Sequence, residues 1–199
     1  VDRVLQEKLS GTERHPWLDD PETSVVVALS RLVPVKNHAL LLDAFAKADC
    51  LGGSTKLVII GDGPEKGPLQ DRARSLGLEA RVDLVGARDN PLPLLKKANL
   101  FVHPSDREGF GLVIVEALAA GVPVIATDCP SGPADILDNG RYGDLVPVGD
   151  ADSLAVAIDR ALLNPPKAKK EAIDRFRIER IVDEYERVLF IQSPATASV

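Results

Sequence analysis

The segment Ser105–Gly111 and the helix predicted after it hold the residues best suited to bind a ligand. Gly109 and Gly111 let the backbone approach a ligand closely, and the free N–H groups at a helix start attract an anion. Glu116 stands in the otherwise apolar run Leu112–Gly121, so its carboxylate needs a partner if that helix is buried. Because helical side chains lean toward the N-terminus, we expect Glu116 to line a cavity near the helix start.

Two carboxylates flank this predicted anion site, Glu108 before the helix and Glu116 within it. An anion-binding site with a carboxylate on either side suits a sugar nucleotide, in which a diphosphate joins two polyhydroxyl rings. The alternative is that Glu108 is a solvated loop residue and that Glu116 pairs with a neighbouring Lys or Arg. The residues alone leave both interpretations open.

Two cations, Arg31 and Lys36, follow the first predicted strand. A guanidinium fork and a point charge both suit a diphosphate, although a solvated loop is the alternative. Gly61-Asp62-Gly63 follows the second strand but lacks the third glycine of a dinucleotide fingerprint, which argues against NAD. A tight turn that lets a base or ribose approach is the better interpretation. His103 ends another strand and is either a polar core residue or part of the site.

Composition excludes several function classes. A net charge of −6 over 199 residues argues against nucleic-acid binding and against a basic membrane-binding face. Cys50 and Cys129 have no metal-ligand spacing, and no Ser/His/Asp arrangement supports hydrolysis. No apolar run reaches membrane-spanning length, and no signal peptide is visible. The absence of Met, even at position 1, indicates a fragment of something longer.

Short apolar runs alternate with amphipathic helical patterns from residue 24 onward. This alternation predicts an α/β fold, a doubly wound parallel sheet of the Rossmann-like type. Its ligands bind at the carboxyl edge, where Arg31, Gly61, Gly86, Ser105 and Thr127 fall. The predicted strands are Val25–Leu29, Lys56–Ile60, Val82–Val85, Leu100–His103, Val122–Ala126 and Asp144–Val146. The predicted helices are His38–Ala48, Leu69–Leu76, Leu92–Lys97, Leu112–Ala120, Ala134–Leu137 and Leu154–Leu163.

The chain ends differ from this middle part. We expect residues 1–22 to be a helical linker plus a loop, 23–166 to be the ligand-binding domain, 167–192 to be a C-terminal helix and 193–199 to be a disordered tail. One charged helix is predicted over Lys167–Phe190, with an apolar stripe that must pack on something. The stripe contains Ile173, Phe176, Ile181, Tyr185, Val188 and Leu189.

Taken together, these motifs resemble a known family. Glu108-Gly109-Phe110-Gly111-Leu112 with Glu116 forms an E-x7-E pattern, and Ser30-Arg31…Lys36 and Gly61-Asp62-Gly63-Pro64 precede it. From Val25 to Asn164 the chain looks like the C-terminal, donor-binding domain of retaining GT-B glycosyltransferases of the glycosyltransferase 4 group. Asp128–Pro133 resembles a subset tied to bacterial polysaccharide or glycan assembly with UDP-sugar donors.

The resemblance implies a role for each matching residue. Arg31 and Lys36 would hold the diphosphate and stabilise the leaving group, and Glu108 would accept hydrogen bonds from the donor sugar; these three form the implied catalytic set. Glu116 would hold the ribose hydroxyls. The remaining implied donor-binding residues are Ser30, Gly61, Gly86, Ala87, Arg88, Ser105, Gly109, Phe110, Gly111 and Leu112.

The implied reaction moves a hexosyl group from a nucleotide sugar, expected to be a UDP-sugar, to a glycan or lipid-linked acceptor. It needs no metal or other cofactor. A missing N-terminal domain would bind the acceptor, so the isolated chain is expected to be inactive or nearly so. The protein is expected to be cytoplasmic, with a peripheral position at the inner membrane left open for the full-length form. Two alternatives stay open: a stand-alone nucleotide-sugar binding module, and an epimerase of sugar nucleotides on the same two-domain fold.

Overall fold

The structure is a computed structural model that describes residues 3–48, 54–166 and 171–190. Its centre is a six-stranded sheet with the order β3-β2-β1-β4-β5-β6, in which every neighbouring pair is parallel. This confirms the predicted doubly wound parallel sheet. The strands are β1 (Val25–Leu29), β2 (Lys56–Ile60), β3 (Val82–Gly86), β4 (Leu100–His103), β5 (Val124–Thr127) and β6 (Asp144–Val146).

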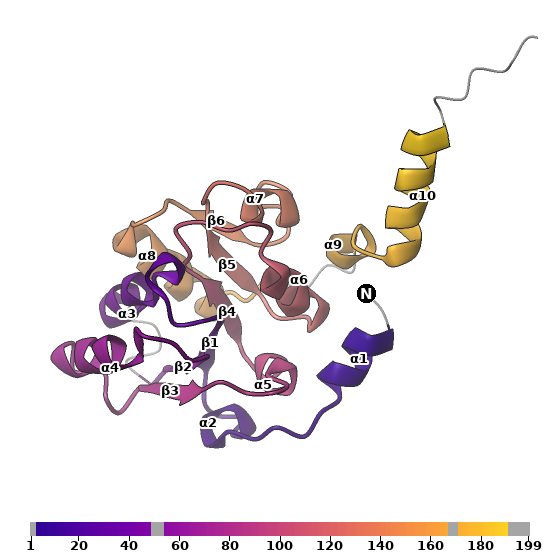
Figure 1. The fold of residues 1–199 in the computed structure, drawn as a ribbon. Helices are drawn as coiled ribbons and strands as arrows, with labels where there is room; N and C mark the ends of the chain where they lie inside the picture. The colour runs from indigo at the N-terminus through magenta and orange to yellow at the C-terminus, as the bar shows by residue number, and fades with distance from the viewer. Residues whose placement is uncertain (1–2, 49–53, 167–170, 191–199) are drawn as a thin grey trace, which may run out of the picture.

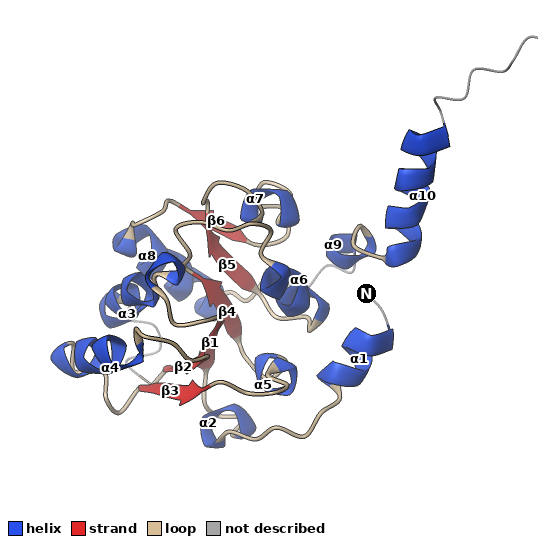
Figure 2. Cartoon of the chain, in the orientation of Figure 1, coloured by secondary structure: helices blue, strands red, loops and turns tan. Residues whose placement is uncertain are grey.

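Two layers of helices cover the sheet (Figures 1 and 2). The layer of α3, α4 and α8 packs on one face, and the layer of α5, α6 and α7 packs on the other. The helices described are α1 (Arg3–Leu9), α2 (Pro16–Asp19), η1 (Pro34–Lys36), α3 (His38–Lys47), α4 (Lys66–Ser75), α5 (Leu92–Leu95), α6 (Leu112–Ala119), α7 (Pro133–Ile136), α8 (Ala151–Leu163), α9 (Glu171–Asp174) and α10 (Ile178–Phe190).

The core explains why the strand sequences are continuously apolar. Along β1, Val26 and Ala28 join the cluster under α3, α4 and α8, whereas Val25 and Val27 join the cluster under α5 and α6. Since successive side chains point to opposite faces, a strand covered on both sides must be apolar at every position. The order of the strands reverses between β1 and β4, which lie side by side at the centre of the sheet. That reversal is the topological switch point, where such sheets bind ligands.

Three elements begin two or three residues from their predicted starts. The strand expected from Val122 begins at Val124, because the N–H of Val122 bonds to the carbonyl of Ala117 and closes the end of α6. Helix α4 begins at Lys66, three residues before the prediction. Helix α8 begins at Ala151, because the Asp150 side chain accepts a hydrogen bond from Ser153 N and caps it.

The single helix expected over Lys167–Phe190 is also wrong within the described residues, since α9 and α10 are separate. Ile173 and Phe176 pack against the domain, and the Phe176 ring meets the Phe110 ring edge to face with centroids 6.1 Å apart. A straight helix could not keep these contacts and also follow α10, which projects away from the sheet (Figure 1). The rest of the predicted stripe, including Tyr185 and Val188, is exposed. Residues 167–170 and the tail 193–199 lie outside the described residues.

The N-terminal segment expected to be a linker packs on the domain. Leu9 and Leu18 are buried in the cluster beneath α5 and α6. His15 is also buried, and its Nε2 lies 3.1 Å from a carboxylate oxygen of Asp83 in β3. Lys97 adds an ion pair with Asp19 at 2.6 Å. The predicted boundary at residue 23 therefore marks the start of the sheet and not the start of the packed structure.

Candidate functional site

Two loops meet at the switch point and bring together residues that are far apart in the sequence. Lys36 belongs to the loop between β1 and α3, and Glu108 belongs to the loop between β4 and α6. The Lys36 ammonium forms an ion pair and hydrogen bond with Oε1 of Glu108. Both side chains are largely buried, with 17% and 8% of their surfaces exposed. The sequence placed both residues at this edge, and the structure joins them directly.

His103, the last residue of β4, lies beneath the same carboxylate. It is buried, and its Nε2 is 2.6 Å from Oε1 of Glu108 and 3.2 Å from Oγ of Ser105. Burial by itself would raise the pKa of the Glu108 carboxyl, but hydrogen bonds from its neighbours, His103 first, lower that pKa from 4.5 to about 2. His103 is therefore both a core residue and a contact of the site, and its place at the end of a strand was the signal in the sequence.

Arg31 differs from Lys36. Its side chain is exposed, and no hydrogen bond or ion pair to it occurs among the described residues. Lys36 is already paired with a carboxylate, whereas the guanidinium of Arg31 is available to an anion. The two cations predicted to act together therefore differ in their ion pairing before any ligand binds.

The Ser30 hydroxyl contacts a buried histidine. It lies 2.8 Å from Nε2 of His38, the first residue of α3. Burial first, and then the nearby His103 and Lys36 side chains, lower the pKa of His38 to about 4. His38 is thus a neutral imidazole that contacts, through Ser30, the loop that carries both cations.

Gly61 has a structural role at the sheet edge. A Cβ at this position would lie 1.8 Å from the carbonyl oxygen of Ser30, so the glycine lets the loop after β2 pack against the loop after β1. The backbone continues this contact, because the N–H of Leu32 bonds to the carbonyl of Asp62 at 2.9 Å. The approach of a base or ribose to this turn stays a prediction.

The loop between β5 and α7 supports Glu108 from the other side. The Ser131 hydroxyl donates to the carbonyl of Glu108 at 2.7 Å. A Cβ on Gly132, whose φ is +92°, would lie 2.0 Å from the carbonyl oxygen of Phe110. The two loops therefore meet through a backbone contact that needs glycine at this position.

The start of α6 is open as predicted. Gly111 is in the left-handed conformation (φ 93°, ψ 46°), and no side chain caps the helix. Gly109 and Phe110 are exposed, and so is Leu112 at 62% of its surface. The apolar sequence of α6 therefore does not mean burial on every face.

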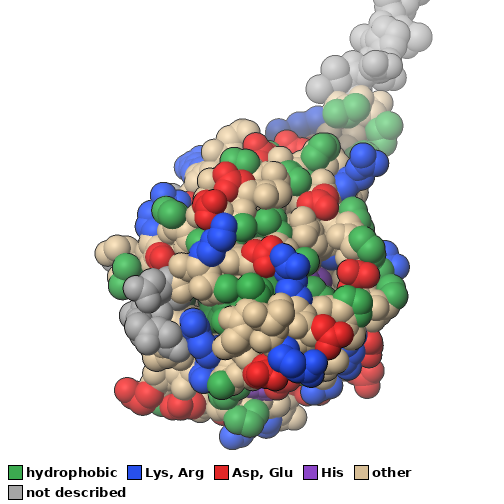
Figure 3. Space-filling view, turned by 90° about the vertical axis from the view of Figure 1, so that its left-hand side faces the viewer, with side chains coloured by type: hydrophobic (Ala, Val, Ile, Leu, Met, Phe, Trp, Pro, Cys, Tyr) green, Lys and Arg blue, Asp and Glu red, His purple; other side chains and the backbone are tan. Residues whose placement is uncertain are grey.

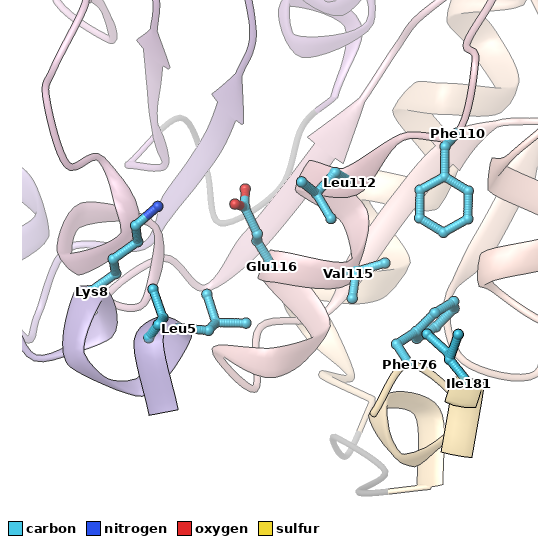
Figure 4. Close-up of a pocket in the computed structure, with 9 residues that line it drawn as sticks. Leu5, Lys8, Phe110, Leu112, Val115, Glu116, Phe176 and Ile181 are labelled. Carbon is cyan, nitrogen blue, oxygen red and sulfur yellow. The ribbon is translucent and has the colours of Figure 1, made fainter. Parts of the chain in front are cut away.

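Glu116 lines a groove, as predicted, and Lys36 and Glu108 are not among the residues around that groove. Figure 4 shows its carboxylate on the same side as the ammonium of Lys8 from α1. The groove has a volume of about 340 Å³. Burial raises the pKa of Glu116, and the charge of Lys8 partly opposes that rise. The other residues around the groove are Val4, Leu5, Phe110, Leu112, Val115, Phe176 and Ile181.

Three of the implied donor-binding residues, Gly86, Ala87 and Arg88, end or follow β3. Gly86 has φ +78°, and its carbonyl accepts a hydrogen bond from Gly61 N at 3.0 Å. Ala87 and Arg88 are exposed, and the Arg88 guanidinium is 3.9 Å from Glu13. These residues stand at the same sheet edge as the Lys36–Glu108 contact, one strand beyond β2.

Charged side chains of both signs are mixed on the face shown in Figure 3. Among the described residues, no group of three or more His, Cys, Asp or Glu side chains is arranged to hold a metal ion. Within the same residues, no helix is long and apolar enough to cross a membrane.

A doubly wound sheet with cations, a carboxylate and an open helix start at its switch point defines an anion-binding domain of the nucleotide-binding class. The family model described as "Glycosyl transferases group 1" matches residues 11–176. The chain belongs to this family, as the resemblance indicated, and its relatives are GT-B glycosyltransferases.

Two curated proteins illustrate what the chain is similar to. An exopolysaccharide phosphotransferase of Streptomyces coelicolor is 40% identical over 82% of this chain and 18% of its own length. An N-acetylgalactosaminyltransferase of Campylobacter jejuni, named for a diphospho-undecaprenol acceptor, is 32% identical over 80% of this chain and 46% of its own length. The chain therefore spans less than half of either relative.

A solved structure has the same fold. Anabaena HepE in complex with UDP-glucose superposes with a TM-score of 0.74 and 30% identity, over 84% of this chain and 49% of that one. The chain therefore corresponds to about half of a GT-B glycosyltransferase.

Proposed function

We propose that this chain is the donor-binding part of a retaining glycosyltransferase that moves a hexosyl group from a UDP-sugar to a glycan or lipid-linked acceptor. The observation that carries the proposal is the Lys36–Glu108 contact at the switch point, with the exposed Arg31 in the same segment between β1 and α3. It combines positive charge for a diphosphate with a carboxylate for sugar hydroxyls. The complex of HepE with UDP-glucose supports the choice of donor, and the name of the Campylobacter relative supports a lipid-linked acceptor.

In this proposal Arg31 and Lys36 bind the diphosphate and stabilise the charge that develops as UDP leaves. The open start of α6 adds backbone N–H groups on the same side. Because these groups supply the positive charge, transfer proceeds without a metal. Glu108 accepts hydrogen bonds from the donor sugar, held in place by His103 and Ser131. Glu116 holds the ribose from its groove.

The acceptor belongs to a part outside this chain, since the relatives are about twice as long. The chain by itself should therefore bind UDP weakly and transfer sugar hardly at all, because closing a two-domain cleft supplies much of the effective concentration of reactants. A stand-alone binding module would give the same binding. It is excluded if the whole protein releases a glycosylated product in which the anomeric configuration is retained.

Titration calorimetry with UDP and with uridine tests the site. Arg31→Ala should weaken UDP binding by about 1–3 kcal/mol, because it removes a charge-assisted contact, and should leave uridine binding unchanged. Arg187→Ala is the matched control, because it removes an exposed arginine on α10. Failure of the wild-type chain to bind UDP, or equal losses for UDP and uridine, would contradict the diphosphate role.

A further inference from the structure

A second contact joins the two loops that carry Lys36 and Glu108. The backbone N–H of Asp106 donates to the carbonyl of Val35 at 2.9 Å. The Asn37 amide nitrogen donates to Oδ1 of Asp106 at 2.7 Å. Asn37 directly follows Lys36, and Asp106 stands two residues before Glu108. The two loops are therefore held together immediately beside the ion pair.

The geometry of Asn37 gives its side chain one orientation. Its backbone is left-handed (φ 43°, ψ 46°), a conformation that Gly, Asn and Asp tolerate best. Its Oδ1 accepts a hydrogen bond from Leu40 N at 3.1 Å and caps α3. Because the oxygen faces the helix, the amide NH₂ must face Asp106, which settles the assignment of oxygen and nitrogen.

We infer that the Asn37–Asp106 hydrogen bond is a positioning contact that sets the spacing between Lys36 and Glu108 and thereby the fit of the nucleotide-sugar donor. The role in donor fit rests on the proposed function. Neither residue reaches the ligand in this inference. Asn37 fixes the start of α3, and Asp106 connects that start to the loop of Glu108. The loop itself is anchored below, because the Ser105 carbonyl accepts a hydrogen bond from the buried Thr127 hydroxyl.

Asn37→Gly is the variant that tests this contact. Glycine keeps the left-handed backbone, costs a helix cap only a few tenths of a kcal/mol and leaves the net charge unchanged, so it removes mainly the contact with Asp106. Asn139→Gly is the matched control, because Asn139 is an exposed asparagine with φ 51° that lies between α7 and β6. Asp106→Ala removes the contact from the other side without changing the cap.

Two measurements on the whole chain separate positioning from stability. UDP affinity is measured by calorimetry, and the pKa of the Glu108 carboxyl by carbon-13 NMR. Asn37→Gly and Asp106→Ala should each weaken UDP binding relative to the Asn139→Gly control, about tenfold for the charge-neutral Asn37→Gly. They should also raise the pH at which Glu108 titrates, since the ion pair with Lys36 loosens.

The exchange variant Asn37→Asp with Asp106→Asn provides the rescue. It keeps the net charge and restores a hydrogen bond of reversed direction, so both values should return to within about threefold of wild type, whereas Asn37→Asp alone should not. Unchanged UDP binding and Glu108 titration in both Asn37→Gly and Asp106→Ala would overturn the inference, as would a change in melting temperature alone. If wild-type chain fails to bind UDP, the proposed function fails, and the Glu108 titration still decides the positioning role.

Discussion

Replacement of Glu108 by Gln should lower stability in a way that depends on pH. The carboxylate is buried against the Lys36 ammonium and Nε2 of His103, and Gln keeps the shape of the side chain without its charge. Burial alone would raise the pKa of Glu108, but the hydrogen bonds from these neighbours lower it to about 2. The ionised form is therefore favoured in the folded state relative to the unfolded chain.

The pKa values set the magnitude and the pH range of the effect. A fall from 4.5 when unfolded to about 2 when folded corresponds to about 3 kcal/mol. Because the folded pKa is the lower one, this stabilisation is complete above about pH 5 and is lost as the pH falls toward 2. The difference in unfolding free energy between wild type and Glu108→Gln should thus be about 3 kcal/mol at pH 7 and about half of that at pH 3.

Urea unfolding followed by the fluorescence of Trp17, the single tryptophan of the chain, measures this difference. Glu22→Gln is the control, because Glu22 is exposed and its carboxylate has no ion pair among the described residues. A difference below about 1 kcal/mol at pH 7 would refute the reasoning, since surface ion pairs reach that value. An equal difference in unfolding free energy at pH 7 and pH 3 would show that Glu108→Gln destabilises the protein through altered packing and not through the lost charge.

Three further results are expected. Glu108→Gln should leave UDP binding unchanged but should lose the preference for UDP-glucose, because the carboxylate is assigned to the donor sugar; calorimetry with both ligands decides this. Glu116→Gln should weaken UDP and UDP-glucose alike by the same method, since its groove is assigned to the ribose, and a loss for UDP-glucose alone would contradict that assignment. Gly132→Ala should lower the unfolding free energy by several kcal/mol more than Gly77→Ala, because both have positive φ but only Gly132 meets a backbone atom within 4 Å; equal losses in urea unfolding would show that the clash relaxes.

The sequence was sufficient for the strands at the centre of the sheet. The predicted bounds of β1, β2 and β4 match the structure, because each is a short apolar run bounded by polar or turn residues. The start of β5 could not be read in this way, since Val122 is as apolar as a strand residue but bonds to the end of α6. The separation of α9 from α10 depends on the contact between Phe110 and Phe176, which no local pattern contains.

For the site, the sequence predicted which residues lie at the carboxyl edge of the sheet, but not which of their side chains contact each other. Arg31 and Glu108 were predicted there because both follow strands that run in the same direction. Whether Lys36 meets Glu108 depends on the register between β1 and β4, in which Val27 lies opposite Phe101. The contacts of Asp106 with Val35 and Asn37 depend on the same register. The need for glycine at position 61 could not be predicted locally either, because the atom that excludes a Cβ belongs to Ser30 in another loop.

The contact between Ser131-Gly132 and the backbone of Glu108 and Phe110 has a consequence for protein engineering. Loops at a sheet edge are often exchanged singly between related enzymes to change which substrate is accepted. Here the loop after β4 is fastened on one side to the loop after β1 and on the other to the loop after β5. A Ser105–Gly111 loop grafted alone would lack the loops after β1 and β5 that hold its conformation. Donor preference should therefore transfer between family members only when all three loops are moved as a unit.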